Sequence, residues 1–177
     1  MIELRPPIPD SQIRKLKAGD EILLSGIVYT ARDQAHARMV VALKKGAKLP
    51  IDIRGQVIYY CGPTKTPPGK VIGACGPTTS RRMDAFTPLL LARGLRVMIG
   101  KGGRSPAVQQ AIKRHHAVYC VTLAGCGALL STFVKKAEPV AYRDLGPEAI
   151  VRLRVEKLPL IVAIDCRGRS IMEGLKP

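Results

Sequence analysis

The sequence predicts an α/β fold in which the middle strands run parallel and further strands lie toward both ends of the chain. Strand-like apolar runs alternate with helical patterns through the middle of the chain, the order typical of a parallel sheet. Both ends are instead rich in β-type runs, so we expect strands there that lie outside the simple repeat. The chain has 177 residues, of which 46% are hydrophobic, enough for one domain with a buried core over residues 1–177.

The N-terminal part is expected to contribute one strand and one helix after a short polar segment. Residues 1–18 form a polar lead-in segment that contains prolines and a short helix. Residues 21–30 have the composition of a strand, with Gly26 as a β-bulge. Asp33 is a suitable N-cap for the helical pattern that follows, and Gly46 closes that helix.

The middle of the chain repeats the order of strand and helix. Gly94 ends one helical pattern, and Ser105 is placed to cap the next. Residues 117–134 carry no charge, but their glycine and hydroxyl residues favour a strand, a turn and a helix over a membrane span. The expected strands are residues 57–61, 71–74, 95–99, 118–123, 150–155 and 158–164, and the expected helices are residues 79–93, 106–115 and 128–136.

The chain is strongly basic. Lys and Arg number 29 against 13 Asp and Glu, which gives a formal net charge of +16. This charge favours an anionic partner: a nucleic acid, an acidic protein surface or a small polyanion. Aromatic residues make up 4% of the chain and tryptophan is absent, so side chains that could stack on bases are scarce. We therefore expect no nucleic-acid partner.

The cysteines indicate a reducing compartment. Their odd number and the lack of a C-x-x-C pair argue against a disulfide framework or a zinc site. We expect reduced, buried thiols, no metal ligands and a cytoplasmic protein. The N-terminus leads into charged residues and two prolines, so we also expect no signal peptide and no membrane segment. The five cysteines are Cys61, Cys75, Cys120, Cys126 and Cys166.

The segment from Gly76 to Asp84 indicates an anion-binding site. A proline and hydroxyl residues separate a predicted strand from a predicted helix, and Arg81 and Arg82 fall in the first turn of that helix. Cations in that turn oppose the helix dipole by about 0.3–1 kcal/mol each. We expect a bound anion to compensate, held by backbone N–H groups, hydroxyls and guanidinium together.

Two other junctions place cations before a helix. Arg32 precedes the helix expected from Asp33, and Lys101 and Arg104 lie in a glycine loop. Taken singly, Arg32 could pair with a neighbouring carboxylate, and the glycine loop, which lacks the spacing of a phosphate loop, could be a solvated turn. Three such junctions together predict a clamp for carboxylates or phosphates. Because no nucleophile–base set is legible and Thr78 is by itself a poor base, these residues resemble half of an active site.

Four motifs resemble a known family: Gly-Asp-Glu-Ile-Leu-Leu-Ser-Gly from residue 19, Tyr-Thr-Ala-Arg-Asp-Gln-Ala-His from residue 29, Gly-Pro-Thr-Thr-Ser-Arg-Arg-Met-Asp from residue 76 and Gly-Lys-Gly from residue 100. In this order they resemble the β subunit, or C-terminal domain, of iron–sulfur-dependent fumarate hydratases (fumarases) and L-tartrate dehydratases. The resemblance covers nearly the whole chain. It implies a single swivelling β/β/α domain, similar to the mobile domain of aconitases.

The resemblance also implies roles for single residues. Arg32, Arg82 and Lys101 match substrate-binding cations of the family by their positions in the motifs. Thr78 matches the residue that moves the proton at the carbon next to a carboxylate, a role that needs activation by nearby groups, including an acid of another subunit. Arg81 stands where the family often has a small residue, so we assign it no substrate role.

By the same resemblance, the chain is the β subunit of a hydro-lyase that reversibly hydrates fumarate to (S)-malate. A separate α subunit carries the 4Fe–4S iron–sulfur cluster through its own cysteines, and the iron acts as a Lewis acid on the substrate. The chain is therefore expected to be active only with the α subunit, in a heterodimer or heterotetramer. L-tartrate or another hydroxy-diacid is the alternative substrate, and a basic nucleic-acid-binding module is the alternative outside this class.

Overall fold

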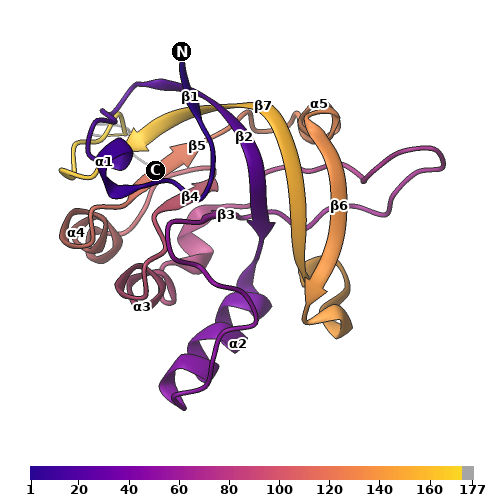
Figure 1. The fold of residues 1–177 in the computed structure, drawn as a ribbon, viewed down its shortest axis with the longest axis horizontal. Helices are drawn as coiled ribbons and strands as arrows, with labels where there is room; N and C mark the ends of the chain where they lie inside the picture. The colour runs from indigo at the N-terminus through magenta and orange to yellow at the C-terminus, as the bar shows by residue number, and fades with distance from the viewer. Residues whose placement is uncertain (173–177) are drawn as a thin grey trace.

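The computed structural model describes residues 1–172 as a seven-stranded sheet with the longer helices packed on one face (Figure 1). The strands are β1 (Ile2–Leu4), β2 (Glu21–Thr30), β3 (Val57–Tyr59), β4 (Val97–Gly100), β5 (Val118–Val121), β6 (Val134–Ala141) and β7 (Ile150–Ile164). The helices are α1 (Asp10–Ile13), α2 (Asp33–Lys44), α3 (Thr87–Ala92), α4 (Pro106–Arg114) and α5 (Gly127–Thr132), with the 3-10 helices η1 (Ser80–Met83) and η2 (Arg143–Glu148).

The sheet is parallel in its first part and closes on itself through its last strand. Strands β1 to β5 pair in chain order and in parallel, as the alternation of patterns predicts. Strand β7 runs antiparallel to β5 and β6 and also pairs with β2, so β2, β3, β4, β5 and β7 form a ring. The α/β fold class is thus confirmed, with the C-terminal strands outside the repeat.

Alternating side chains divide the core into two parts. Val57 and Tyr59 of β3 lie in a cluster inside the ring, whereas Ile58 and Tyr60 belong to a second cluster beneath the helices. Because side chains alternate along a strand, each strand can serve both clusters at once. Helices α2, α3 and α4 supply the apolar side chains of the second cluster, among them Met39, which is fully buried.

The prediction of one helix over residues 79–93 is wrong, because the structure has two shorter helices there, η1 and α3. Pro88 has no N–H to donate, and its ring would clash with the carbonyl four residues earlier, so a continuous helix cannot pass through it. Helix α3 instead begins at Thr87, with the proline in its first turn. Arg81 and Arg82 therefore lie in a four-residue 3-10 helix, and the conflict expected with the dipole of a long helix does not arise.

The strand expected over residues 71–74 is also wrong. The backbone bends there, and Gly73 packs so closely on Thr64 that an added Cβ would lie 2.1 Å from the Thr64 carbonyl oxygen. The Ala74 N–H donates to the Thr64 hydroxyl at 2.8 Å instead of to a neighbouring strand. Ile72 is nevertheless buried in the core, which explains the apolar character of this run in the sequence.

In the C-terminal third, the strands begin and end at other residues than the sequence predicts. The helix expected over residues 128–136 ends at Thr132, because the backbone from Val134 pairs with β7 as strand β6. The two runs expected at residues 150–155 and 158–164 are one long strand, β7. Strand β1 was not expected, because its three residues lie in the polar lead-in segment.

Local signals elsewhere predicted the structure well. The Ser105 hydroxyl accepts the Val108 N–H at 3.4 Å and caps α4, as its sequence position predicts. Gly26 lies at a shift in the register between β2 and β7, where a bulge was expected. Within residues 1–172, none of the helices is both long and apolar enough to cross a membrane.

Candidate functional site

The parallel strands β2, β3 and β4 end at the same edge of the sheet, and the predicted site residues follow them. The segment that carries Thr78 lies between the ends of β3 and β4. The Thr78 N–H donates to the Tyr60 carbonyl at 2.7 Å, and the Thr78 carbonyl accepts from the Lys101 N–H at 3.3 Å. The Ser80 N–H donates to the Lys101 carbonyl at 3.0 Å. Backbone bonds therefore fix Thr78 and Lys101 side by side.

Arg32 and Arg82 come together around one carboxylate. Arg32 follows β2 as the N-cap residue of α2, and Arg82 lies in η1. Arg82 Nε donates to Asp33 Oδ1 at 2.8 Å, and Asp33 Oδ2 lies 3.7 Å from Arg32 Nε. Glu148 Oε1 of η2 lies 3.7 Å from Arg32 Nη2. The structure thus brings the two predicted arginines together, and their shared counter-ion holds them in place.

Asp33 does not cap α2 in the way its sequence position predicts. It is the first residue of the helix, and the Gln34 N–H of that first turn donates to Glu148 Oε2 at 2.8 Å instead. The negative charge of Asp33 still suits the positive end of the helix. The carboxylate points to Arg32 and Arg82 instead. The sequence does not predict that Asp33 orients these two arginines.

Both arginines retain hydrogen-bonding capacity. Arg32 Nε is buried, and no acceptor among residues 1–172 bonds to it. The Arg82 side chain is 52% exposed, and within the same described residues its terminal nitrogens form no hydrogen bond. A buried guanidinium donor without a partner is costly, and carboxylates and phosphates match guanidinium geometry well. This edge of the sheet is therefore suited to bind an anion.

Gly62 allows Arg32 to lie against the chain that leaves β3. A Cβ at residue 62 would be 2.8 Å from Arg32 Nη1 and 3.1 Å from the Pro147 carbonyl oxygen. The first distance is shorter than real Cβ atoms show, and the second is tighter than most real Cβ contacts, so a neighbouring group would have to move. The placement of the Arg32 guanidinium therefore depends on glycine at this position.

Arg104, expected beside Lys101 as a second cation of the glycine loop, turns into the core instead. Its Nε donates to Asp84 Oδ1 at 2.7 Å, and its Nη2 donates to Thr87 Oγ1 at 2.8 Å. The guanidinium also lies over the Tyr119 ring, 5.0 Å from the centroid. Arg104 is thus not available to a ligand, and its charge joins the glycine loop to the segment after η1.

The Tyr119 hydroxyl makes a second connection between the same two segments. It donates to the Gly102 carbonyl at 2.7 Å and accepts from the Ser80 hydroxyl at 2.9 Å. Ser80 in turn packs on Gly100, where a Cβ would lie 2.0 Å from the serine oxygen. The Tyr119 hydroxyl therefore holds the loop of Lys101 and the segment of Thr78 and Arg82 together on their buried side.

His36 lies directly under the clamp. Its Nδ1–H donates to the Arg32 carbonyl at 2.8 Å, and its ring packs edge-on against Tyr60. Burial, with a smaller effect of the Arg104 charge, lowers the pKa of His36 to about 4. The imidazole is therefore neutral near pH 7, and its role at this position is to hold the backbone of Arg32.

Two thiols lie at the base of the site. Cys61 follows β3 and Cys75 precedes the Thr78 turn, and both are buried. The hydrogen bond between the two thiols, helped by burial, raises the pKa of Cys61, and the same bond lowers the pKa of Cys75. As expected, four of the cysteines are buried free thiols, whereas Cys126 is partly exposed.

The described residues do not offer a place for an iron–sulfur cluster. No three His, Cys, Asp or Glu side chains within residues 1–172 gather closely enough to hold a metal ion. Cys61 donates to Cys75, and Cys75 donates to the Gly73 carbonyl at 3.4 Å inside the core, so the two residues do not present an open set of thiolates. The groups that this chain itself brings to the site are cations, hydroxyls and backbone groups.

Comparisons with known proteins agree with the motifs. Residues 1–175 match the family model described as Fumarase C-terminus. The chain is 36% identical to fumarate hydratase 1, mitochondrial, of Leishmania major, with 99% of the chain and 33% of that protein covered. It is 34% identical to the aerobic class I fumarate hydratase of Escherichia coli K12, again over 99% of the chain and 33% of that protein.

A third relative has nearly the length of this chain. The putative L(+)-tartrate dehydratase subunit beta of Methanocaldococcus jannaschii is 40% identical, and the match covers 91% of this chain and 86% of that protein. The chain therefore spans about a third of the length of the fumarate hydratases cited above, but most of the length of this subunit. The family match and these relatives together show that the chain belongs to the fumarase C-terminus family.

Proposed function

We propose that this chain is the β subunit, and the substrate-clamping half, of an iron–sulfur hydro-lyase that reversibly hydrates fumarate to (S)-malate. The observation that carries this proposal is the sharing of Asp33 by Arg32 and Arg82 at the sheet edge where Thr78 and Lys101 lie side by side. Relatives named fumarate hydratase support the reaction class.

The cations explain how a dicarboxylate would be held. The terminal nitrogens of Arg32 and Arg82, which form no hydrogen bond among residues 1–172, suit binding of one carboxylate, and Lys101, the backbone neighbour of Thr78, adds a point charge. Asp33 and Glu148 offset much of the charge of the two arginines while orienting them. A clamp fixed in advance in this way does not need to reorganise when the substrate binds.

Thr78 is the residue we assign to proton transfer. Loss of a proton from the carbon next to a carboxylate moves negative charge onto that carboxylate, and nearby cations stabilise the charge as it develops. Backbone bonds to Tyr60 and Lys101 hold Thr78 next to Lys101, which supports this assignment. Since a threonine hydroxyl needs activation, we assign that task to an acid of the partner chain.

The rest of the site is assigned to a partner. Because the described residues offer no set of cluster ligands, we propose that the 4Fe–4S cluster belongs to an α subunit that covers this sheet edge. The beta-subunit name of the M. jannaschii relative supports a two-subunit enzyme. We assign the protein to the cytoplasm, where thiols stay reduced, because its cysteines are free thiols.

L-tartrate is the second candidate substrate. The observation that favours it is the 40% identity to the putative L(+)-tartrate dehydratase subunit beta, a protein of similar length. Fumarate, malate and tartrate share the two carboxylates that the clamp would bind. The substrates are distinguished by offering all three to the same reconstituted pair and comparing kcat/KM.

The test uses this chain together with the α subunit of the same source, expressed together without oxygen. We expect fumarate hydration by the pair and none by this chain alone. Arg82→Ala should lower kcat/KM by about 10²–10³-fold, the usual cost of a lost charge-stabilising donor. Arg81→Ala is the matched control, because Arg81 is exposed and neighbours Arg82 in η1. Equal activity of both variants would contradict the site, and an inactive wild-type pair would contradict the function.

A further inference from the structure

Residues 62–74, called the arm below, project from the body of the protein between β3 and the Thr78 turn (Figure 1). The Thr64 N–H donates to the Ala74 carbonyl at 3.1 Å and closes the base of the arm. The Lys70 N–H donates to the Pro67 carbonyl at 3.2 Å and closes its tip. Residues 64–71 are all exposed. Residues 64–71 of the arm therefore contribute little to the core, whereas Ile72 at its base is buried there.

The arm is shaped in advance although few hydrogen bonds support it. Pro63, Pro67 and Pro68 restrict its backbone, and Gly69 turns the tip with a φ of +72°. At the base, Gly73 allows the two sides to approach as closely as they do. A segment stiffened in this way loses little conformational entropy when it docks, which favours a role in binding.

The base of the arm belongs to the candidate site. Its first residue, Gly62, packs against Arg32, and its last residues lead through Cys75 to Thr78. The Cys75 N–H donates to the Gly127 carbonyl at 2.9 Å, which places the start of α5 beside the same turn. A second chain that lies over Thr78 would therefore meet the arm and α5.

A hollow of about 650 Å³ separates the arm from α5. Its lining includes Lys70, Val71 and Ile72 of the arm, together with Thr132 and Lys135 on the other side. Val71, which lines the hollow, is 52% exposed. The hollow thus combines apolar side chains with lysines, a composition suited to an acidic segment that also carries apolar residues.

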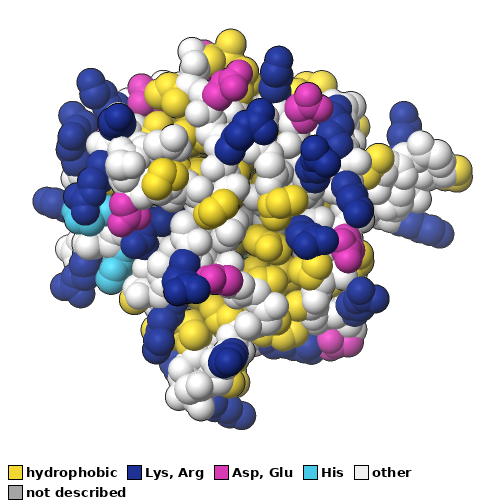
Figure 2. Space-filling model, in the orientation of Figure 1, with side chains coloured by type: hydrophobic (Ala, Val, Ile, Leu, Met, Phe, Trp, Pro, Cys, Tyr) yellow, Lys and Arg dark blue, Asp and Glu magenta, His cyan; other side chains and the backbone are white. Residues whose placement is uncertain are grey.

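The residues that line the hollow include two lysines and no carboxylate. Residues 53–137 contain one carboxylate, Asp84, and that carboxylate is paired with buried Arg104. No carboxylate among residues 1–172 forms an ion pair with Lys65, Lys70 or Lys135. Basic side chains are spread widely over the face in Figure 2, including the projecting arm.

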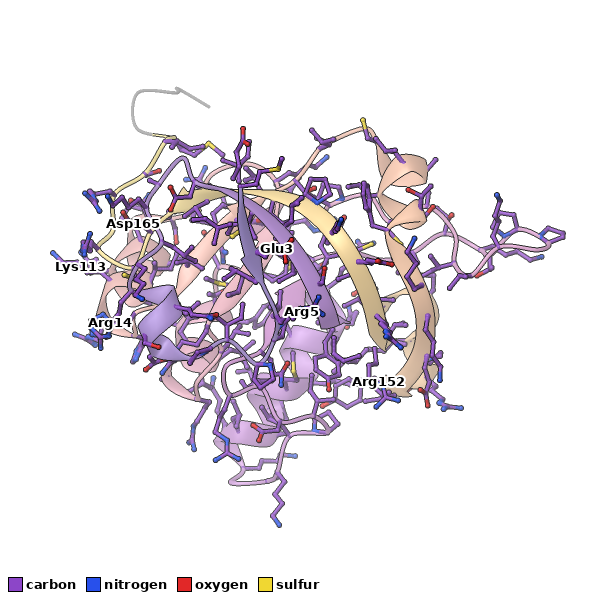
Figure 3. The ribbon with its side chains drawn as sticks, turned by 45° about the horizontal axis from the view of Figure 1, so that its top comes forward. Glu3, Arg5, Arg14, Lys113, Arg152 and Asp165 are labelled. Carbon is purple, nitrogen blue, oxygen red and sulfur yellow. The ribbon has the colours of Figure 1, made fainter. Side chains whose placement is uncertain are left out.

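Some surface arginines, unlike the lysines of the arm, form ion pairs among residues 1–172. Arg152, labelled in Figure 3, donates from Nη2 to Glu138 at 2.7 Å across β6 and β7, well away from the arm. Unlike Arg152, Lys65 and Lys70 of the arm form no ion pair with the carboxylates that the structure describes. The chain that docks on the arm is therefore expected to supply the carboxylates.

We propose that the arm and α5 form the docking surface for the partner chain that completes the site, and that this partner presents an acidic segment with apolar residues to the hollow. The inference rests on the proposed function, because that function requires a second chain over Thr78. The continuity of the arm with the Thr78 turn selects this partner over an unrelated protein.

The test measures binding and activity separately. This chain and the α subunit of the same source are purified, and their Kd is determined by biolayer interferometry at two salt concentrations. Lys65→Glu combined with Lys70→Glu should weaken binding about tenfold or more and reduce its salt dependence, since charges at an interface act through steering and complementarity. Lys45→Glu combined with Lys48→Glu, at exposed positions around the end of α2, is the matched control and should bind as the wild type does.

The possible outcomes distinguish the docking surface from the proposed function. Wild-type Kd for the arm variant, or an equal loss in the control, would overturn the arm as a docking surface even when the wild-type pair is active. A wild-type pair that binds through the arm but neither hydrates fumarate nor dehydrates malate or tartrate would overturn the proposed function alone. Absence of any binding between the wild-type chains would overturn both.

Discussion

Arg104 is buried, with its Nε 2.7 Å from Asp84 Oδ1, and this ion pair links two loops that carry site residues. Asp84 Oδ2 also accepts the Ser105 N–H at 2.6 Å, so one carboxylate bonds the glycine loop twice. Asp84 directly follows η1, which carries Arg82, and Arg104 lies three residues after Lys101. The relative placement of these two cations thus depends on a charge pair beneath them.

Asp84→Ala should destabilise the protein by about 3–5 kcal/mol, because it leaves the Arg104 guanidinium buried without its counter-ion. Urea denaturation followed by circular dichroism measures the change in the free energy of unfolding. Glu138→Ala is the control, because it removes an exposed partner of Arg152 and should change stability little. Similar midpoints for the two variants would show that the buried pair does not support the fold.

Tyr119→Phe tests whether the loops need the hydroxyl beneath them. The ring stays in the core, but the bonds to Ser80 and Gly102 are lost, at a cost of about 1–2 kcal/mol in stability. In the reconstituted pair, we expect kcat/KM for fumarate to fall by about tenfold, the effect of about 1.4 kcal/mol in the transition state. Tyr29→Phe is the control, since no described residue bonds to the Tyr29 hydroxyl, and it should leave kcat/KM unchanged.

Stability should fall as the pH is lowered from about 6.5 to about 4, because of His36. In the unfolded chain the imidazole has its ordinary pKa of 6.5, whereas burial lowers the pKa in the folded protein to about 4. Between these values the unfolded chain binds more protons, so the free energy of unfolding decreases with falling pH, by up to about 3 kcal/mol for this group. Above pH 6.5 both states are neutral and the contribution is constant.

His36→Phe keeps an aromatic ring beside Tyr60 and Phe86 but cannot bind a proton. The variant should therefore be less sensitive to pH between 4 and 6.5, measured by urea denaturation at several pH values. A pH dependence as steep as that of the wild type would mean that other groups, such as His115, whose pKa is lowered by burial, account for the effect.

The thiols should react in an order set by burial. Cys126 is the partly exposed cysteine, whereas Cys61, Cys75 and the others are buried. Although the bond from Cys61 lowers the pKa of Cys75, a thiol without access to solvent reacts slowly. Brief treatment of the native protein with iodoacetamide should modify Cys126 first, as read by peptide mass spectrometry. Modification of Cys75 before Cys126 would show that the base of the site opens readily.

Local signals allowed much of the fold to be predicted, and long-range partners account for most of what could not. Ser105 caps α4 through a neighbour three residues away, so its role is readable from the sequence. Asp33 meets Arg82 across 49 positions, and no local pattern reports that pairing. Likewise, Val134 starts a strand because β7 lies beside it, although the preceding residues continue a helical pattern.

The inward turn of Arg104 shows the same limit at the site. The sequence predicts cations in the glycine loop but not which of them face a ligand. Lys101 stays near the surface, whereas Arg104 is drawn inward by Asp84 and Thr87, which lie 20 and 17 positions away. The break at Pro88, in contrast, follows from a local rule that also holds for the sequence alone.

Gly62→Ala should weaken substrate binding more than it weakens the fold. The added Cβ would lie 2.8 Å from Arg32 Nη1 and 3.1 Å from the Pro147 carbonyl, so the guanidinium must move away from its place beside Asp33. Because the carboxylate clamp would then be misplaced, we expect KM for fumarate to rise about tenfold or more in the reconstituted pair. Thermal unfolding of the chain alone shows how much of the effect is structural.

Gly103→Ala is the matched control for Gly62→Ala, because a Cβ at residue 103 meets no atom within 4 Å and the backbone there does not need a positive φ. This variant should keep the KM and the melting temperature of the wild type, although it lies in the same loop as Lys101. If both glycine variants raise KM equally, the site tolerates no change in either loop and the specific contact of Gly62 with Arg32 is not the cause. A rise confined to Gly62→Ala ties substrate affinity to the position of Arg32.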